Sequence, residues 1–176
     1  MTQHDGFIDF LLKLESEQDR AALAELRRGV GQTLDEMPEL GRYIFHFFKE
    51  PNRHKEDAFF LIATLFAMHS KNITTGNMGN HLRDMAEGNA EELERLEKRF
   101  AQLLTANRAD LPELLPRIVN LLKAKDKERP INWSQLLDDV IYWGAGRQRE
   151  WARGFWTKGK PESDSGMENE TISIQE

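Results

Sequence analysis

The longest apolar run of this 176-residue chain, AFFLIATLFAM at residues 58–68, limits what the chain can fold into. Its 11 residues are too few to cross a bilayer, for which about 20 are needed. A helix through this run is apolar nearly all round, so we expect it to be the most buried helix in its half of the molecule. Other amphipathic segments must supply the surfaces that cover it.

The other periodic segments of the chain are also helical. Leu96, Phe100 and Leu103, for example, form one buried stripe within residues 77–108. No window shows β alternation of useful length, and no repeat of fixed period appears. We therefore predict an all-α fold of eight or nine short helices, arranged as one compact body or as two abutting helical bundles.

Capping signals place several helix ends. Asn89 and Glu92 have the spacing of a capping box, and so do Asp110 and Glu113, so helices should begin just after Asn89 and Asp110. Pro38 suits the first turn of another helix, whose apolar face runs to residue 47.

Charge is unevenly distributed along the chain. The whole chain carries 24 basic and 30 acidic residues, a net charge of −6, which argues at first against a nucleic-acid partner. Residues 161–176 hold five of the acids and no base, so residues 1–160 are nearly neutral and can still carry a basic surface. We predict one all-helical domain over residues 1–160, with a sub-bundle boundary near 105–110, followed by a disordered acidic tail over 161–176.

The residue types needed for catalysis or metal binding form no familiar motif. The sequence has no P-loop, GxGxxG, HExxH or GxSxG pattern, and it has no cysteine. His54 with Asp57 and His81 with Asp84 share the i,i+3 spacing of some metal sites, but such pairs are far more often accidental surface neighbours. We expect no enzyme, no cofactor and no metal. The N-terminus lacks the basic region of a signal peptide, so we expect a cytoplasmic location and no membrane partner.

Two pairs of arginines stand at like-charged i,i+4 positions, Arg95 with Arg99 and Arg149 with Arg153. Such a pair costs an isolated helix about 0.2–0.5 kcal/mol, which a bound anion would relieve. Glu91 lies four residues before Arg95 and can pair with it, whereas Arg99 has no acid three or four residues away. A solvated basic face explains the first pair about as well. Two such pairs on separate helices nevertheless favour an anionic ligand.

Six further arginines are candidates for the same ligand: Arg27, Arg28, Arg53, Arg108, Arg117 and Arg147. The first two end a helix, where cations also stabilise the helix dipole. Arg117 has Glu113 four residues earlier, which favours an ion pair instead. The C-terminal run GRQREWARGFWTKGK at 146–160 sets arginines beside Trp151 and Trp156, which suits contacts with nucleic-acid backbones and bases. Tryptophan is, however, more often packed in a core.

Six stretches in a fixed order carry a family resemblance: ELRRG at 25–29, PNRH at 51–54, TTGNMGNHL at 74–82, EKRFAQLLTANR at 97–108, INWSQLLDDVIYWG at 131–144 and RQR at 147–149. Together they resemble the CasB family, the small subunit of the type I-E CRISPR surveillance complexes called Cascade. No single motif is diagnostic, and the order and spacing carry the match. The acidic tail lies outside the family pattern.

The resemblance implies an all-helical, non-enzymatic protein that is present in two copies beside the backbone and large subunits of Cascade. It implies a basic surface that binds guide RNA and target DNA and stabilises the R-loop, including the displaced strand, in antiviral defence. The family's basic positions fall on Arg27, Arg28, Arg53, Arg99, Arg108, Arg117, Arg147 and Arg149, whereas Arg153 rests on the charge-pair argument alone. The basic surface is expected to be weaker at Asn80 and Ala145. The alternative is an assembly-only scaffold whose basic surface binds acidic partner subunits.

Overall fold

The computed structural model describes residues 3–124 and 129–157. Within these ranges the chain forms eight α-helices and three 3₁₀ helices, with no strand. The α-helices are α1 (Gln3–Ser16), α2 (Arg20–Arg28), α3 (Arg53–Met68), α4 (Met78–Ala86), α5 (Ala90–Leu104), α6 (Leu111–Ala124), α7 (Trp133–Ile141) and α8 (Ala145–Trp156). The 3₁₀ helices are η1 (Pro38–Tyr43), η2 (Phe45–Phe47) and η3 (Arg108–Asp110). The all-α prediction is confirmed, while the acidic tail predicted over 161–176 lies outside the described residues.

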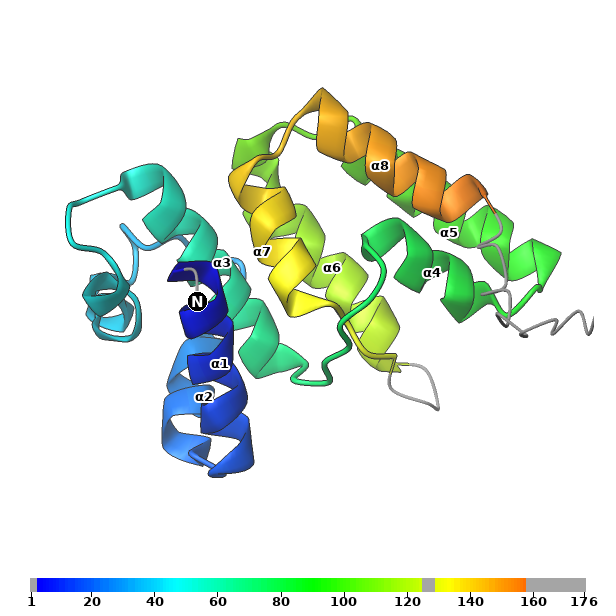
Figure 1. Cartoon of the computed structure of the whole chain (residues 1–176). Coiled ribbons are helices and arrows are strands. Elements are labelled where there is room, and N and C mark those ends of the chain that lie inside the picture. Colours follow the sequence, from blue (N-terminus) through cyan, green and yellow to red (C-terminus); the bar gives the residue numbers. More distant parts are fainter. Residues whose placement is uncertain (1–2, 125–128, 158–176) are drawn as a thin grey trace, which may run out of the picture.

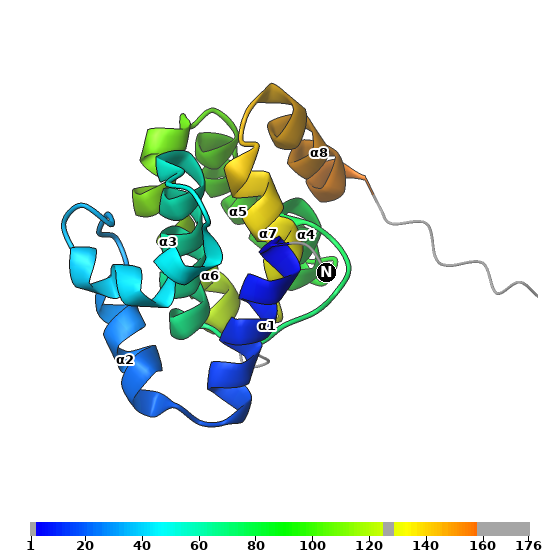
Figure 2. The ribbon, with the colours of Figure 1, turned by 60° about the vertical axis from the view of Figure 1, so that its left-hand side comes forward.

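The helices lie in two groups joined by a shared centre. α1, α2 and α3 lie at one end and α4, α5 and α8 at the other, with α6 and α7 between them (Figures 1 and 2). Buried apolar residues from every one of the eight α-helices join in one cluster. Residues 105–110 connect α5 to α6, which pack against each other. The sub-bundle boundary expected at this connection stays a prediction.

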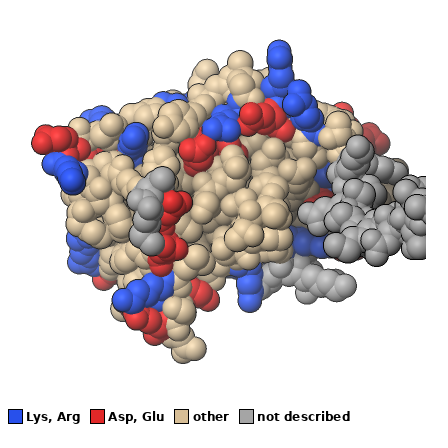
Figure 3. Space-filling model, viewed as in Figure 1, with Lys and Arg blue, Asp and Glu red and all other residues tan. Residues whose placement is uncertain are grey.

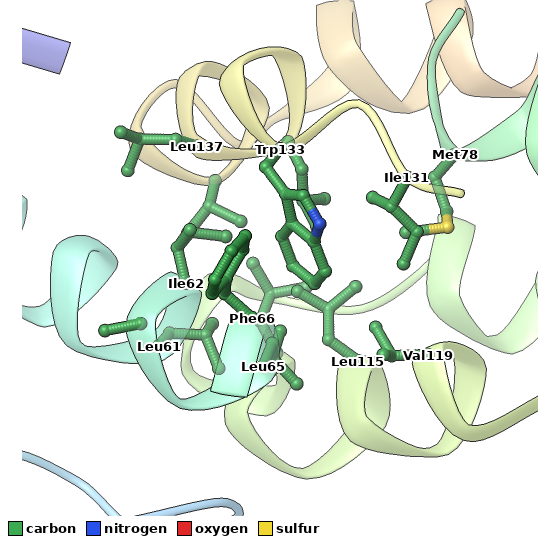
Figure 4. Packing of buried hydrophobic residues seen from close by; sticks show 14 of the residues in the cluster. Leu61, Ile62, Leu65, Phe66, Met78, Leu115, Val119, Ile131, Trp133 and Leu137 are labelled. Atoms are coloured by element: carbon green, nitrogen blue, oxygen red, sulfur yellow. The ribbon is translucent and has the colours of Figure 1, made fainter. Parts of the chain in front are cut away.

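α3 is the most buried helix of the α1–α3 group, as its apolar sequence predicted. All ten residues from 58 to 67 are buried, and the helix packs against α1, α2, α6 and α7. Asn52 is its N-cap, because the Asn52 side chain accepts a hydrogen bond from the backbone N–H of Lys55 at 3.1 Å. Phe66 of α3 lies edge-on against Trp133 of α7, with ring centroids 5.6 Å apart (Figure 4).

α8 lies unusually close to α4. A Cβ atom on Gly79 would stand 1.9 Å from the carbonyl oxygen of Trp151, and one on Gly154 would stand 2.5 Å from Asn77 Oδ1. At Gly79 only glycine fits without moving a helix, because the atom in the way belongs to the α8 backbone, whereas a Cβ atom on Gly154 would displace the Asn77 side chain and stand 3.1 Å from the Asn80 backbone nitrogen. The contact therefore requires the small residues that the sequence supplies at both points.

Polar side chains of α4 then bind the last turn of α8. Asn80 donates to the carbonyl of Gly154 at 3.3 Å, and Arg83 donates to the carbonyl of Phe155 at 2.7 Å. Carbonyls in the last turn of a helix have no partner within that helix, so these bonds satisfy groups that would otherwise need water. The positive charge of Arg83 also stabilises the C-terminal end of the helix dipole. α4 thus fixes both the distance and the position of α8.

One predicted helix differs from the structure, and both predicted helix starts are confirmed. The helix expected from Pro38 to residue 47 is instead the pair η1 and η2, which close with i to i+3 hydrogen bonds. Apolar residues three apart fit a short 3₁₀ helix as well as an α-helix, so the pattern could not distinguish them. α6 begins at Leu111, directly after Asp110 as predicted, but the Asp110 carboxylate accepts from Asn107 N at 3.0 Å within η3 instead of forming a capping box with Glu113. Asn89 is the N-cap of α5, as predicted.

Candidate nucleic-acid interface

A buried hydrogen-bond network sets the rotation of α8. Asp139 of α7 is 1% exposed, and its carboxylate accepts from Trp151 Nε1 at 2.6 Å and from Gln135 Nε2 at 2.9 Å. Burial raises the pKa of Asp139, and the hydrogen bonds from Trp151 and Gln135 oppose this by stabilising the carboxylate. Because Trp151 faces α7, the opposite side of α8 faces solvent.

Two predicted arginines and one tryptophan occupy this outer side of α8. Arg149, Arg153 and Trp156 are all exposed, and we call them the α8 stripe. Within the described residues, neither arginine side chain has an ion-pair or hydrogen-bond partner. The single carboxylate of α8, Glu150, is bound by Arg147 at 2.9 Å. Figure 3 shows the basic groups standing out over α8 at the upper edge of the molecule. The predicted like-charged pair is therefore open to a ligand.

The second cationic surface is a groove of about 310 Å³ between α5 and α6. Arg99 and Arg117 line it together with apolar side chains of both helices. Arg117 is bound by Glu113, as its i,i+4 spacing predicted. Arg99 is exposed, and its side chain has no partner within the part of the chain that the structure describes. Arg99 is thus the free cation of this groove.

Arg53 and Arg108 line one cavity of about 460 Å³, but both bind groups of this chain. Arg53 pairs with Asp35 and lies 4.0 Å from Asp57. Burial raises the pKa of Asp57, while the charge of Arg53 lowers it. Arg108 donates to the carbonyl of Ile141 at 2.7 Å, at the end of α7. These two arginines therefore support the fold as well as facing the cavity.

The remaining three candidates have unequal surroundings. Arg147 lies 2.6 Å from Asp138 as well as binding Glu150, and its side chain is only 26% exposed. Arg27 donates through Nε to the carbonyl of Ala67 at 2.9 Å. Arg28 is exposed and has no side-chain partner among the described residues.

The nine predicted arginines therefore fall into two groups. Those that bind other groups of the chain are Arg27, Arg53, Arg108, Arg117 and Arg147. Those without a side-chain partner in residues 3–124 and 129–157 are Arg28, Arg99, Arg149 and Arg153. The α8 stripe brings two of these together, whereas Arg27 and Arg28 lie on α2, at the other end of the molecule from α8 (Figure 1). The exposure of Trp156 was not predicted, although its spacing of seven from Arg149 indicates a shared helix face.

The histidines show no arrangement of a metal site. In the described part of the chain, no three side chains of His, Cys, Asp or Glu gather closely enough to hold a metal ion. His81, which has metal-like spacing to Asp84, accepts a hydrogen bond from the backbone N–H of Asn132 at 3.1 Å. Burial lowers the pKa of His81 to about 4. None of the helices described here has the length and apolar character of a membrane span.

A family model matches the part of the chain that carries these surfaces. The model, described as CRISPR-associated protein Cse2, matches residues 22–156. The chain belongs to the Cse2 family. All nine predicted arginines lie within the matched Cse2 region, and the CasB resemblance seen in the sequence is confirmed. No curated protein sequence matches the chain.

Solved structures share the fold of this Cse2-family chain. CasB from Thermus thermophilus is 26% identical with a TM-score of 0.74, over 89% of this chain and 99% of that one. CasB from M. ruber is 23% identical with a TM-score of 0.71, over 89% and 93% of the two chains. A chain of a CRISPR RNA-guided surveillance complex is 24% identical with a TM-score of 0.74, over 87% and 91%. The T. thermophilus protein is thus matched almost end to end, whereas about a tenth of this chain has no counterpart in it.

Proposed function

We propose that this Cse2-family protein is a non-catalytic subunit of a CRISPR RNA-guided surveillance complex and binds nucleic-acid backbones without reading their sequence. In that role it stabilises the R-loop formed by guide RNA and target DNA, including the displaced strand, in antiviral defence. Family membership and the fold shared with a chain of such a complex support the assignment. The observation that carries the binding role is the pair of arginines on the outer side of α8, Arg149 and Arg153, whose side chains have no partner among residues 3–124 and 129–157.

Phosphate is the ligand that this pair suits best. The two guanidinium groups repel each other in the free chain, and a phosphate placed beside them removes that repulsion. Arginine binds phosphate with two parallel hydrogen bonds, which are stronger than bonds between neutral groups. Contacts with phosphates position a nucleic acid but carry no sequence information. The surface therefore suits a subunit that must accept any target.

Weak contacts of this kind are sufficient for R-loop stabilisation. The RNA–DNA heteroduplex is about as stable as the DNA duplex that it replaces. Protein contacts with the nucleic-acid backbone can therefore shift the equilibrium toward the R-loop. Each 1.4 kcal/mol changes the equilibrium tenfold. Arg99 on α5 and the arginines of the α8 stripe supply several such contacts from one subunit. Guide RNA, target DNA, a second copy of the chain and the backbone and large subunits of the complex are the proposed partners.

A second candidate is an assembly-only scaffold whose arginines bind acidic surfaces of partner subunits. One observation favours it: Arg53 and Arg147 already bind carboxylates within this chain. An acidic partner would offer the free arginines the same chemistry. The two candidates differ in whether the isolated chain binds DNA.

Fluorescence anisotropy of the purified chain with single- and double-stranded oligonucleotides, from low to physiological salt, tests the proposal. The logarithm of the binding constant should fall linearly with the logarithm of salt concentration, with a slope of about −0.7 for each phosphate contact with a single strand. Oligonucleotides of unrelated sequence should bind alike. An absence of binding at every salt concentration, combined with normal assembly, would favour the scaffold.

Charge reversal in the assembled complex tests the R-loop role directly. The double change Arg99→Glu and Arg149→Glu should shorten R-loop lifetime. The matched control, Arg20→Glu with Lys49→Glu, alters net charge equally at exposed residues on or near the α1–α3 end of the molecule and should leave the lifetime unchanged. An R-loop lifetime that is equal in all three proteins would refute the proposed function.

A further inference from the structure

Trp156 differs from the other three tryptophans of the chain in exposure and in hydrogen bonding. Trp133 and Trp151 are 0% exposed and Trp143 is 8% exposed, whereas Trp156 is 46% exposed. Each buried indole N–H donates a hydrogen bond: Trp133 to the Lys71 carbonyl, Trp143 to the Ala106 carbonyl and Trp151 to Asp139. The indole of Trp156 has no such acceptor among the described residues. Three tryptophans are therefore core residues, and Trp156 presents its ring to solvent.

The position of Trp156 on α8 aligns it with the free arginines. At 3.6 residues per turn, Arg149, Arg153 and Trp156 lie within about 60° of one another around the helix. They span about 10 Å along its axis, at 1.5 Å per residue. The opposite side of α8 carries the buried residues Trp151 and Phe155. The two cations and the exposed ring therefore form one continuous surface.

The ring of Trp156 is held in place on one side. It lies 5.9 Å from the ring of Phe100 and 5.1 Å from the ring of Phe155, measured between centroids. Both phenylalanines are 0% exposed, so they belong to the fixed core. A braced ring loses little conformational freedom when a ligand stacks on it, which favours binding. Trp156 is thus a supported surface ring rather than a loose side chain.

From this arrangement we infer that the α8 stripe is a site for single-stranded nucleic acid, in which Trp156 stacks on a base while Arg149 and Arg153 bind the flanking phosphates. Bases of a duplex are already stacked on each other and hidden from an indole, whereas those of a single strand are open. An aromatic ring beside cations is the arrangement that binds single strands without sequence preference. The inference rests on the proposed function and adds a base contact to it: at α8 Trp156 stacks on a base of the displaced strand whose phosphates the arginines bind.

The test compares Trp156→Ala and Trp156→Phe with the wild-type chain. Stacking of one base on an aromatic side chain raises the affinity for a single strand by about 5- to 100-fold. We expect Trp156→Ala to lose this factor for an unstructured single strand, with duplex affinity changed less than twofold. Trp156→Phe, which keeps an aromatic ring, should retain most of the affinity. A strand of abasic nucleotides with the same number of phosphates should bind wild type and Trp156→Ala equally.

Fluorescence gives a second readout that is independent of affinity. Because Trp156 is the one exposed tryptophan of the four, a stacked base should quench the emission that iodide can reach in the free protein. The abasic strand should leave that emission unchanged. A strand that binds without quenching would overturn the stacking role.

The remaining outcomes separate this inference from the proposed function. If Arg149→Glu weakens binding of single strands but Trp156→Ala does not, the backbone-binding function stands and the stacking site is refuted. If Trp156→Ala lowers single-strand and duplex affinity equally, or weakens only subunit assembly, the ring has a structural or protein-binding role and the inference fails. If the wild-type chain binds no nucleic acid and R-loop lifetime is unaffected by Arg149→Glu, both proposals fail together. Thermal unfolding of each variant confirms that it is folded.

Discussion

The close contact between α4 and α8 predicts that Gly79→Ala destabilises the protein, although alanine is the better helix former. In a helix interior this change alone would add about 0.5–1 kcal/mol of stability. Here the new Cβ atom would stand 1.9 Å from the Trp151 carbonyl oxygen and 3.0 Å from the backbone nitrogen of Phe155. Both atoms belong to the α8 backbone, so the whole helix must move rather than a side chain.

The expected loss follows from that movement. Overpacking of a well-packed contact costs about 1–3 kcal/mol, and each hydrogen bond lengthened beyond its range, such as the one from Asn80 to the Gly154 carbonyl, costs about 1 kcal/mol more. After the helix-propensity gain, we expect a net loss of about 1–3 kcal/mol. For a protein of this size that lowers Tm by about 2–4 °C for each kcal/mol.

Thermal unfolding followed by circular dichroism measures this loss, with Gly146→Ala as the control. Gly146 lies in α8 itself, and a Cβ atom there would meet nothing within 4 Å, so Tm should stay the same or rise. Single-strand affinity should fall in Gly79→Ala, because the α8 stripe moves with its helix, and should be unchanged in Gly146→Ala. If Gly79→Ala were as stable as Gly146→Ala, the close contact would not exist in solution and the reasoning would be wrong.

Two further changes test the electrostatics of the chain. Burial lowers the pKa of His81 to about 4, so on acidification the imidazole takes up its proton at higher pH in the unfolded chain than in the folded protein. The free energy of unfolding should therefore fall by up to about 3 kcal/mol as pH drops from 6.5 to 4. Urea unfolding across that range should show a smaller fall in His81→Gln; an identical pH profile would contradict the assignment. Removal of residues 161–176 deletes five carboxylates and no base, so single-strand affinity at low salt should rise about two- to tenfold and the difference should vanish at high salt. Equal affinities at low salt would show that the tail does not oppose binding.

Local sequence rules predicted most of the fold because most helix ends are set by residues that are near one another in the sequence. The N-cap at Asn89 accepts hydrogen bonds from the backbone N–H groups of Glu91 and Glu92, so neighbouring residues contain the whole signal. The apolar run at 58–68 was expected to need several helices to cover it, and α1, α2, α6 and α7 pack against it. The error at residues 38–47 arose because a segment of ten residues with apolar positions three apart is compatible with two helix types.

The surroundings of the arginines were less predictable because many of their partners are distant in sequence. The i,i+4 rule correctly paired Arg117 with Glu113, and it missed by one position at Arg95, which lies 3.4 Å from Glu92. Arg27, in contrast, binds a carbonyl 40 residues away. Packing of α2 against α3 creates that contact, and no pattern of spacing contains it. A sequence can therefore show which arginines lack a local partner, but only the fold shows which lack any.

The fixed orientation of α8 makes the free arginines more than a solvated face. Turning or sliding a helix as a rigid body leaves two of its own cations at the same distance from each other, but it can bring them closer to carboxylates of neighbouring elements. α8 cannot turn, because Trp151 is bound to buried Asp139, and it cannot slide, because Asn80 and Arg83 hold the carbonyls of its last turn. Side-chain rotation and hydration still reduce the repulsion between the two guanidinium groups in part. The Cα atoms of Arg149 and Arg153 nevertheless stay about 6 Å apart along the helix axis. A phosphate backbone places negative charge between them without moving the helix, and this is why we expect charge reversal at Arg149 to weaken binding more than reversal at Arg28, which has no cation held at such a distance on its own helix face.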